Sequence, residues 1–140
     1  MINQGNKMKK ISTILFVLIS LLFTYCDESE PVVGSKDDTS IPNLSFAVDT
    51  TYLDSPNSRL VAKGTVKNKS SSQVTSPWYV ECQFYTNSSK TTKLGGNYTQ
   101  IGVPLAKNES TFWTITYSSS NVNVNDYPNF AVGNLRGIYK

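Results

Sequence analysis

The chain has 140 residues, of which 13 are lysine or arginine, 10 are aspartate or glutamate and none is histidine. Without histidine, Ser-His-Asp and Cys-His catalytic sites and the common zinc ligand sets are excluded, and two cysteines cannot build a framework of several disulfides. The basic residues are scattered along the chain, so the clustered basic face that nucleic-acid binding requires is not expected.

The first predicted element is an apolar run, residues 11–25, that follows Lys7, Lys9 and Lys10. A positive head before a short apolar run is typical of a bacterial secretory signal. As a helix this run would measure about 22 Å, less than the ~30 Å hydrocarbon core of a bilayer. The pattern therefore predicts a signal helix over residues 1–25 and disfavours a membrane-spanning helix.

A single cysteine, Cys26, follows the apolar run and precedes an acidic cluster at residues 27–30. This arrangement resembles a bacterial lipoprotein signal, although Tyr25 stands where that family favours a small residue. The resemblance implies acylation of Cys26, by palmitate among other acyl chains, and attachment to the outer membrane through the lipid. The acidic cluster is similar to the tags of lipoproteins that reach the outer surface. The alternatives are ordinary cleavage, which predicts a periplasmic or secreted protein, and retention of the uncleaved segment as an anchor.

Residues 26–41 are predicted to be the lipidated cysteine and a disordered acidic tether. Residues 27–40 hold five acids and one lysine, a net charge of −4, and too few apolar side chains to bury. Residues 41–140 hold nine basic and five acidic residues, a net charge of +4. Residues 42–140 are long enough for one domain with a single core.

The first half of the domain contains two predicted strands and then the clearest one. Apolar and polar residues alternate over residues 44–53 and again over 59–68, and the intervening turn residues predict an antiparallel hairpin. Alternation is strongest over residues 78–85. There the apolar set Trp78, Val80, Cys82 and Phe84 is expected to face the core, and the set Tyr79, Glu81, Gln83 and Tyr85 to face water.

The second half continues the pattern. Residues 93–101 predict a strand with a bulge or an edge position at its paired glycines, and residues 110–117 a strand with Ile115 facing inward. Two short strands are expected over residues 130–132 and 135–140. Six or seven short strands without helical periodicity predict an all-β, immunoglobulin-like antiparallel β-sandwich.

Two motifs of this domain carry a further resemblance. The segment Gly64-Thr65-Val66-Lys67-Asn68, followed by a polar loop and by Cys82-Gln83-Phe84-Tyr85-Thr86, resembles the FxLYD-type immunoglobulin-like domains of bacterial envelope lipoproteins. Cys82 and Thr86 stand where the Phe and Asp of the name motif would be. The resemblance implies a small sandwich with an accessory or binding role, and it brings no catalytic or ligand residues.

The candidate binding residues are aromatic: Trp113, Tyr79 and Tyr85 are proposed to form a surface for a protein or glycan partner. No metal site, cofactor or catalytic residue is predicted, because the five carboxylates of the domain are dispersed. We expect a non-enzymatic, lipid-anchored cell-envelope protein that binds or scaffolds. The alternatives are a carbohydrate-binding accessory module with an exposed Trp113, a carboxylate-based hydrolase, and a structural subunit with a free edge strand over residues 93–101.

Overall fold

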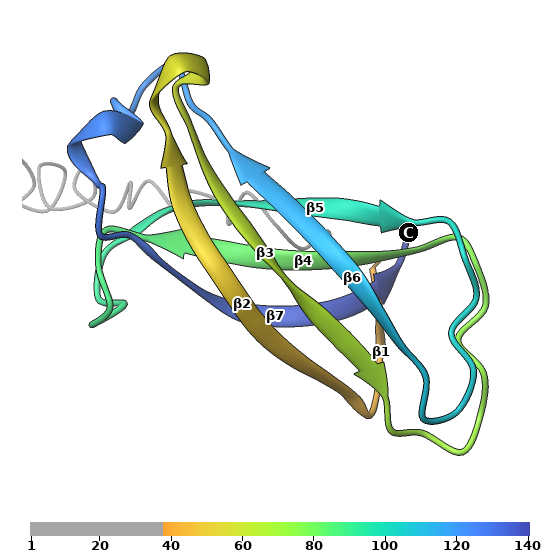
Figure 1. Ribbon diagram of the computed structural model, residues 1–140. Coiled ribbons are helices and arrows are strands. Elements are labelled where there is room, and N and C mark those ends of the chain that lie inside the picture. Colours follow the sequence, from red (N-terminus) through yellow and green to blue (C-terminus); the bar gives the residue numbers. More distant parts are fainter. Residues whose placement is uncertain (1–37) are drawn as a thin grey trace, which may run out of the picture. The chain divides into compact units, whose positions relative to one another are not determined.

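The computed structural model describes residues 38–140, which form two antiparallel β-sheets packed face to face (Figure 1). The predicted signal helix, Cys26 and nearly all of the predicted tether lie outside these residues. The strands are β1 (Thr39–Ile41), β2 (Leu44–Asp54), β3 (Arg59–Asn68), β4 (Trp78–Tyr85), β5 (Lys93–Ile101), β6 (Ser110–Tyr117) and β7 (Ala131–Tyr139). Two single-turn 3-10 helices, η1 (Ser55–Asn57) and η2 (Val124–Asp126), complete the described part, and no helix there is long and apolar enough to span a bilayer.

One sheet has the strand order β1-β7-β4-β5 and the other β2-β3-β6. The chain therefore changes sheet after β1, β3, β5 and β6, and the prediction of an all-β antiparallel sandwich is confirmed at that level. The predicted hairpin is also present, because β2 pairs with β3 from Leu44↔Asn68 to Asp54↔Arg59. At its tip Ser58 adopts a left-handed conformation, with φ of 48°, and closes η1.

The core lies between the sheets and follows the predicted alternation of β4. Trp78, Val80, Cys82 and Phe84 are all 0% exposed. From the other sheet, β6 presents Trp113, Ile115 and Tyr117 inward, as predicted from Ile115. The rings of Phe84 and Tyr117 stack across the core with centroids 5.4 Å apart. Cys82, the cysteine within the described residues, is free, so apolar packing holds the two layers together, with hydrogen bonds from Asn97 to the Thr116 carbonyl oxygen and from Tyr117 to the Leu94 carbonyl oxygen between β5 and β6.

Gly64 is required by this packing. It lies opposite Trp113 in the β3–β6 register, and a Cβ there would overlap both the indole ring and the carbonyl oxygen of Ala47. The indole also donates to the Thr65 carbonyl oxygen at 3.1 Å. A glycine in β3 therefore gives the space that a buried tryptophan of β6 occupies.

Asn68 ends β3 and joins two loops to the core. It is 0% exposed, and its amide donates to the carbonyl oxygens of Ser72 at 2.8 Å and Leu105 at 2.9 Å. Its side-chain oxygen accepts from the backbone N–H and the hydroxyl of Ser70. The spacing Gly-x-Val-x-Asn is thus explained by packing at Gly64 and Val66 and by hydrogen bonds at Asn68.

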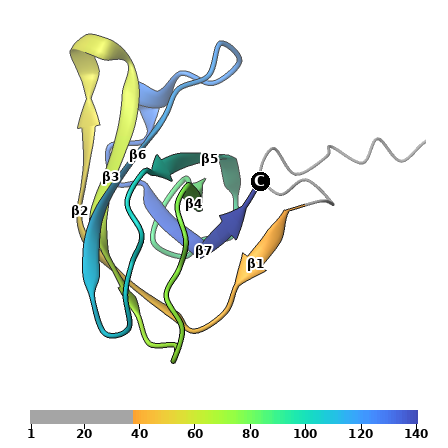
Figure 2. The same ribbon diagram turned by 90° about the vertical axis from the view of Figure 1, so that its right-hand side faces the viewer.

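Two predictions about strands are corrected. Residues 39–41 belong to the sheet, not to the tether, because β1 pairs with β7 over Thr39↔Tyr139 to Ile41↔Gly137, and Figure 2 shows β1 leaving the layer of β2 to run beside β7. The two short strands predicted around residues 130–140 are one strand, β7. Its interruption at Asn134, with φ of 51°, is a bulge that the strand absorbs.

The predicted edge position of β5 is confirmed. Among the described strands β5 pairs with β4 alone, and Leu94 forms a bulge because Phe84 lies opposite Gly95 and Tyr85 opposite Lys93. The glycine is again a packing site, since a Cβ on Gly95 would lie 2.5 Å from the Tyr117 ring.

Candidate functional site

The outer face of the four-stranded sheet carries the side chains with the most binding chemistry. We call it the tyrosine face, and the cross-strand registers place on it Tyr79, Glu81, Gln83, Tyr85, Tyr98, Gln100, Asn134, Arg136 and Ile138. Two of the three predicted surface residues, Tyr79 and Tyr85, therefore lie on one face. Tyr79 is half-buried and Tyr85 is 9% exposed, so much of each ring packs against its neighbours.

Glu81 lies at the centre of this face and is only 3% exposed, which contradicts the expectation that it points into water. It lies between Tyr98 of β5 and Arg136 of β7, and the Arg136 Nε donates to its Oε1. Its Oε2 is buried and makes no hydrogen bond with residues 38–140. A buried carboxylate needs a charge partner, and Arg136, 55 residues later, supplies it. This separation is the reason why the local alternation in β4 could not predict the burial of Glu81.

Beside Glu81, three polar side chains form a hydrogen-bonded cluster. The amide of Asn134 donates to the Tyr85 hydroxyl at 3.0 Å and to the Gln83 side-chain oxygen at 3.4 Å. Tyr85 in turn donates to Gln83 at 3.3 Å. The left-handed bulge at Asn134 aims this amide at the face, because asparagine tolerates that conformation better than most residues. The cluster fixes the orientation of the Tyr85 hydroxyl.

On the other side of Glu81, two tyrosines form a corner. The rings of Tyr79 and Tyr98 are nearly perpendicular, at 85°, with centroids 5.7 Å apart. The ammonium nitrogen of Lys140 lies 3.6 Å from the centroid of Tyr98 and 5.9 Å from that of Tyr79. Tyr98 is 46% exposed, so this corner is the accessible aromatic part of the face. The strand alternation of β5 was too weak to select Tyr98 in advance.

The third predicted surface residue, Trp113, is not on any surface. It is 2% exposed and packs over Gly64 in the core, so it cannot serve as an exposed stacking residue. Trp78 is also buried, as expected, and donates to the Val103 carbonyl oxygen at 3.0 Å. The exposed aromatic of β6 is instead Phe112, at 77%, on the outer side of the three-stranded sheet. Sequence reasoning missed it because the alternation of β6 has aromatic residues on both sides.

Asp54 and Cys82, two other reactive side chains of the domain, are engaged in local hydrogen bonds or buried. Asp54 accepts from Asn57 and from Arg59, and these hydrogen bonds hold the pKa of Asp54 below its ordinary value. Burial, with a smaller contribution from Glu81, raises the pKa of the Cys82 thiol to about 12. That thiol is protonated at neutral pH and is no nucleophile. Within residues 38–140 no cluster of three potential metal ligands occurs.

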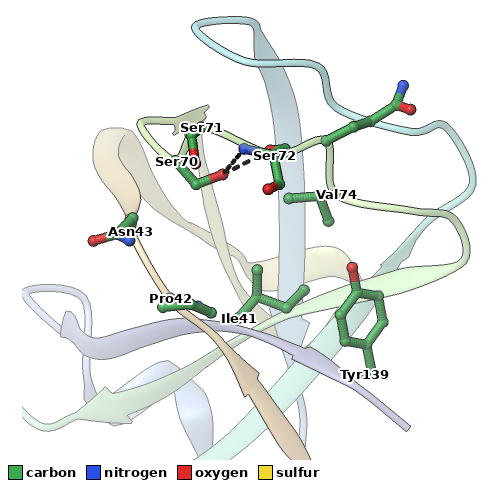
Figure 3. A pocket seen from close by; sticks show the side chains of 9 residues that line it. Ile41, Pro42, Asn43, Ser70, Ser71, Ser72, Val74 and Tyr139 are labelled. Carbon is green, nitrogen blue, oxygen red and sulfur yellow. Dashed lines mark hydrogen bonds between the residues drawn. The ribbon is translucent and has the colours of Figure 1, made fainter.

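A cavity of about 310 Å³ lies between the β1–β2 turn and the serine-rich loop after β3 (Figure 3). Ile41, Val74 and Tyr139 line its apolar side. Two of its polar side chains are engaged: the Ser70 hydroxyl donates to the Ser72 carbonyl oxygen at 2.6 Å, and the Tyr139 hydroxyl accepts from the Thr75 N–H at 3.1 Å. The cavity holds no charged side chain and one aromatic ring, so it offers a ligand less than the tyrosine face does.

The described residues thus define a β-sandwich with an aromatic and polar outer face that includes an ion pair between the buried Glu81 and the partly exposed Arg136. Comparison of the chain with protein-family models, with curated proteins and with solved structures gives no match. The assignment of a function therefore rests on the chemistry of the chain itself.

Proposed function

We propose that the protein is a non-enzymatic binding module that a lipid on Cys26 anchors to the cell envelope, and that it binds its partner through the tyrosine face. The observation that carries this proposal is the ion pair between the buried Glu81 and the partly exposed Arg136, beside the Tyr79–Tyr98 corner. Charged groups are expensive to bury, and a domain of this size has little stability to spare. A recognition surface gives such a pair a use that packing alone does not.

The fold supports an immunoglobulin-like assignment, and with it the resemblance to FxLYD-type domains. Strands β2, β3 and β6 form one layer and β1, β7, β4 and β5 the other, and from β2 onward the chain crosses between layers after β3, β5 and β6. These crossings support an immunoglobulin-like sandwich, a fold that also buries a tryptophan on the strand that follows the first crossing of its hairpin into the other layer. Trp78 of β4 matches that position.

Anchoring is proposed from the sequence of the leader and of Cys26. The lysine-headed apolar run and the acidic residues after the cysteine support an outer-membrane lipoprotein whose domain is held away from the bilayer. Release into the periplasm or the medium is the alternative.

Binding is favoured over catalysis because four of the five carboxylates of the domain already form a hydrogen bond or an ion pair with another residue. Asp54 bonds to Asn57 and Arg59, and Glu81 to Arg136. Glu109 accepts from the Ala106 N–H, and Asp126 from the Asn123 amide. The glycan alternative is carried by the Tyr79–Tyr98 corner instead of Trp113, since aromatic rings bind sugars and peptides alike.

Two experiments test the proposal. Cys26→Ser should move the protein out of the alkali-washed membrane fraction, and retention there would contradict the anchoring.

For binding, glycan and peptide arrays should be probed with wild type, with Tyr79→Ala/Tyr98→Ala, and with Phe112→Ala as the control. Phe112 is an exposed aromatic on the opposite sheet, at 77% against 46% for Tyr98. The double variant should lose the array signal and the control should keep it; the reverse pattern would move the site to the other sheet.

A further inference from the structure

The Tyr79–Tyr98 corner already holds a cation, the ammonium group of Lys140. We infer that this corner, above Glu81, is a binding site for the ammonium group of a ligand, and that Lys140 occupies it in the free protein. The inference rests on the proposed function, because it names the chemistry that the tyrosine face recognises.

The ring geometry is that of a partial aromatic cage. A cation is attracted to the negative face of an aromatic ring within about 6 Å of the centroid. The Lys140 nitrogen meets this condition for both rings, at 3.6 Å and 5.9 Å, and the 85° angle between the rings lets one group contact both. Two rings set at such an angle enclose a cation from two sides, which a flat stacking surface does not.

The carboxylate beneath the corner supplies the second observation. Glu81 lies directly across from Tyr98 and two residues from Tyr79 on the same face. Arg136 engages only its Oε1, so a buried oxygen, Oε2, is left without a donor among the described residues. An unpaired buried carboxylate oxygen costs free energy. The negative charge of Glu81, next to Tyr98 and Tyr79 on the same face, favours a cation at this corner.

The charges of the site also allow a ligand ammonium to replace that of Lys140. Glu81 carries one negative charge, Arg136 offsets it, and one more cation, Lys140, is held by the rings. Exchanging Lys140 for a ligand ammonium leaves the net charge of the site unchanged. The exchange therefore needs only that the Lys140 side chain, which is exposed, swing into water.

A second cation–π contact shows what an ordinary surface pair looks like. Lys63 lies 5.3 Å from the centroid of Tyr52 on the opposite sheet. That pair has one ring, and its residues have no buried carboxylate as a cross-strand neighbour in the β2–β3 and β3–β6 registers. Lys63 and Tyr52 are thus a matched control for Lys140 and Tyr98.

The ligand chemistry is an alkyl or quaternary ammonium, which a lysine side chain and a choline head group share. Two probes separate these sources: Nα-acetyl-lysine methylamide and choline chloride. Each is titrated into the full-length chain carrying Cys26→Ser in dodecyl maltoside, a detergent without an ammonium group. Binding is followed by the NMR shifts of the tyrosine ring resonances.

Lys140→Ala should bind the better probe about three- to tenfold more tightly than the protein with Lys140, because the internal competitor is gone. Lys140→Arg should restore the weaker affinity, and Lys63→Ala should not change it. Adding Tyr98→Ala to Lys140→Ala should abolish saturable binding. Tighter binding of choline identifies a quaternary head group, and tighter binding of the lysine derivative identifies a side chain.

The inference is overturned if neither probe saturates Lys140→Ala, or if Lys140→Ala binds no more tightly than the parent. It is also overturned if removing the Tyr98 ring leaves the affinity intact. The array experiment is independent of this result: a ligand that still depends on Tyr79 and Tyr98 would keep the proposed function while excluding ammonium as its chemistry.

Discussion

Asn68 offers the sharpest test of how this fold is held together, because the chain contains a matched partner for it. Asn87 begins the loop after β4, and its side-chain oxygen accepts from the Ser89 N–H and hydroxyl, as that of Asn68 does from Ser70. Both are Asn-x-Ser sequences. Asn87 is exposed, whereas Asn68 is fully buried and donates two further bonds, to Ser72 and Leu105.

We expect Asn68→Ala to lower the free energy of unfolding by about 3 kcal/mol and Asn87→Ala by about 0.5 kcal/mol. Each of the two additional buried bonds contributes roughly 1 kcal/mol, and the space left by the amide adds about another. Asn68→Asp should cost more than Asn68→Ala, because it places an acceptor opposite two carbonyl oxygens. The Ser72 and Leu105 carbonyls keep one other partner each, from Ser70 and Val74, which limits the loss.

The assay is urea unfolding followed by tryptophan fluorescence, since Trp78 and Trp113 are both buried and report the loss of the core. The m-value should remain unchanged, so that the midpoint alone carries the difference. Equal losses for the two alanine variants, within about 0.5 kcal/mol, would refute the reasoning. The local turn would then carry the whole contribution, and the bonds across the loops none.

Three further predictions follow from the core and from one turn. Gly64→Ala should lower the free energy of unfolding by about 2 kcal/mol or more, because its Cβ would overlap Trp113. Gly102→Ala, whose Cβ would meet nothing within 4 Å, should change it by no more than about 0.5 kcal/mol. Equal losses for the two variants in urea unfolding would contradict this expectation. Cys82 should resist alkylation at pH 8 until urea unfolds the chain, and a native thiol that reacts freely would exclude this burial. The free energy of unfolding should fall as pH rises from the ordinary thiol pKa of about 8.5 to the folded value of about 12, because in that range the Cys82 thiol ionises only in the unfolded chain. Asp54 should stabilise the fold, measured as the difference in free energy of unfolding between wild type and Asp54→Asn, at pH values above the unfolded carboxyl pKa of about 3.9. This contribution should be lost as pH falls through the lowered folded pKa. A difference that is constant down to pH 2 would rule out the hydrogen bonds from Asn57 and Arg59 as its source.

The sequence predicted those parts of the fold that local patterns encode. The strands β2 to β6 were anticipated almost to the residue, because alternation and turn residues mark them. The inward face of β4 was correct since four apolar residues alternate with polar ones. β1 was missed because three residues with one apolar side chain carry no periodic signal, and only pairing with β7 orders them.

The candidate site was predicted less well because its contacts join distant parts of the chain. The burial of Glu81 depends on Arg136, and the corner of Tyr79 depends on the register with β5. Trp113 was expected on the surface, and the glycine that receives it stands 49 positions earlier, in another strand. The glycine and asparagine at residues 133–134 were interpreted as a break, whereas the strand continues through them as a bulge.

The short strand β1 is also the element that should detach first when the domain is under tension. It is held by three residue pairs to β7, whereas β2 is held to β3 by ten. A pull that enters the domain at residue 38 therefore loads the weakest ladder first. Once β1 detaches, residues 39–43 become a free segment that spans at most roughly 17 Å, at about 3.4 Å per residue, before the hairpin bears any force. A partner bound to the tethered domain can then move farther from the anchor by this distance while the core stays folded.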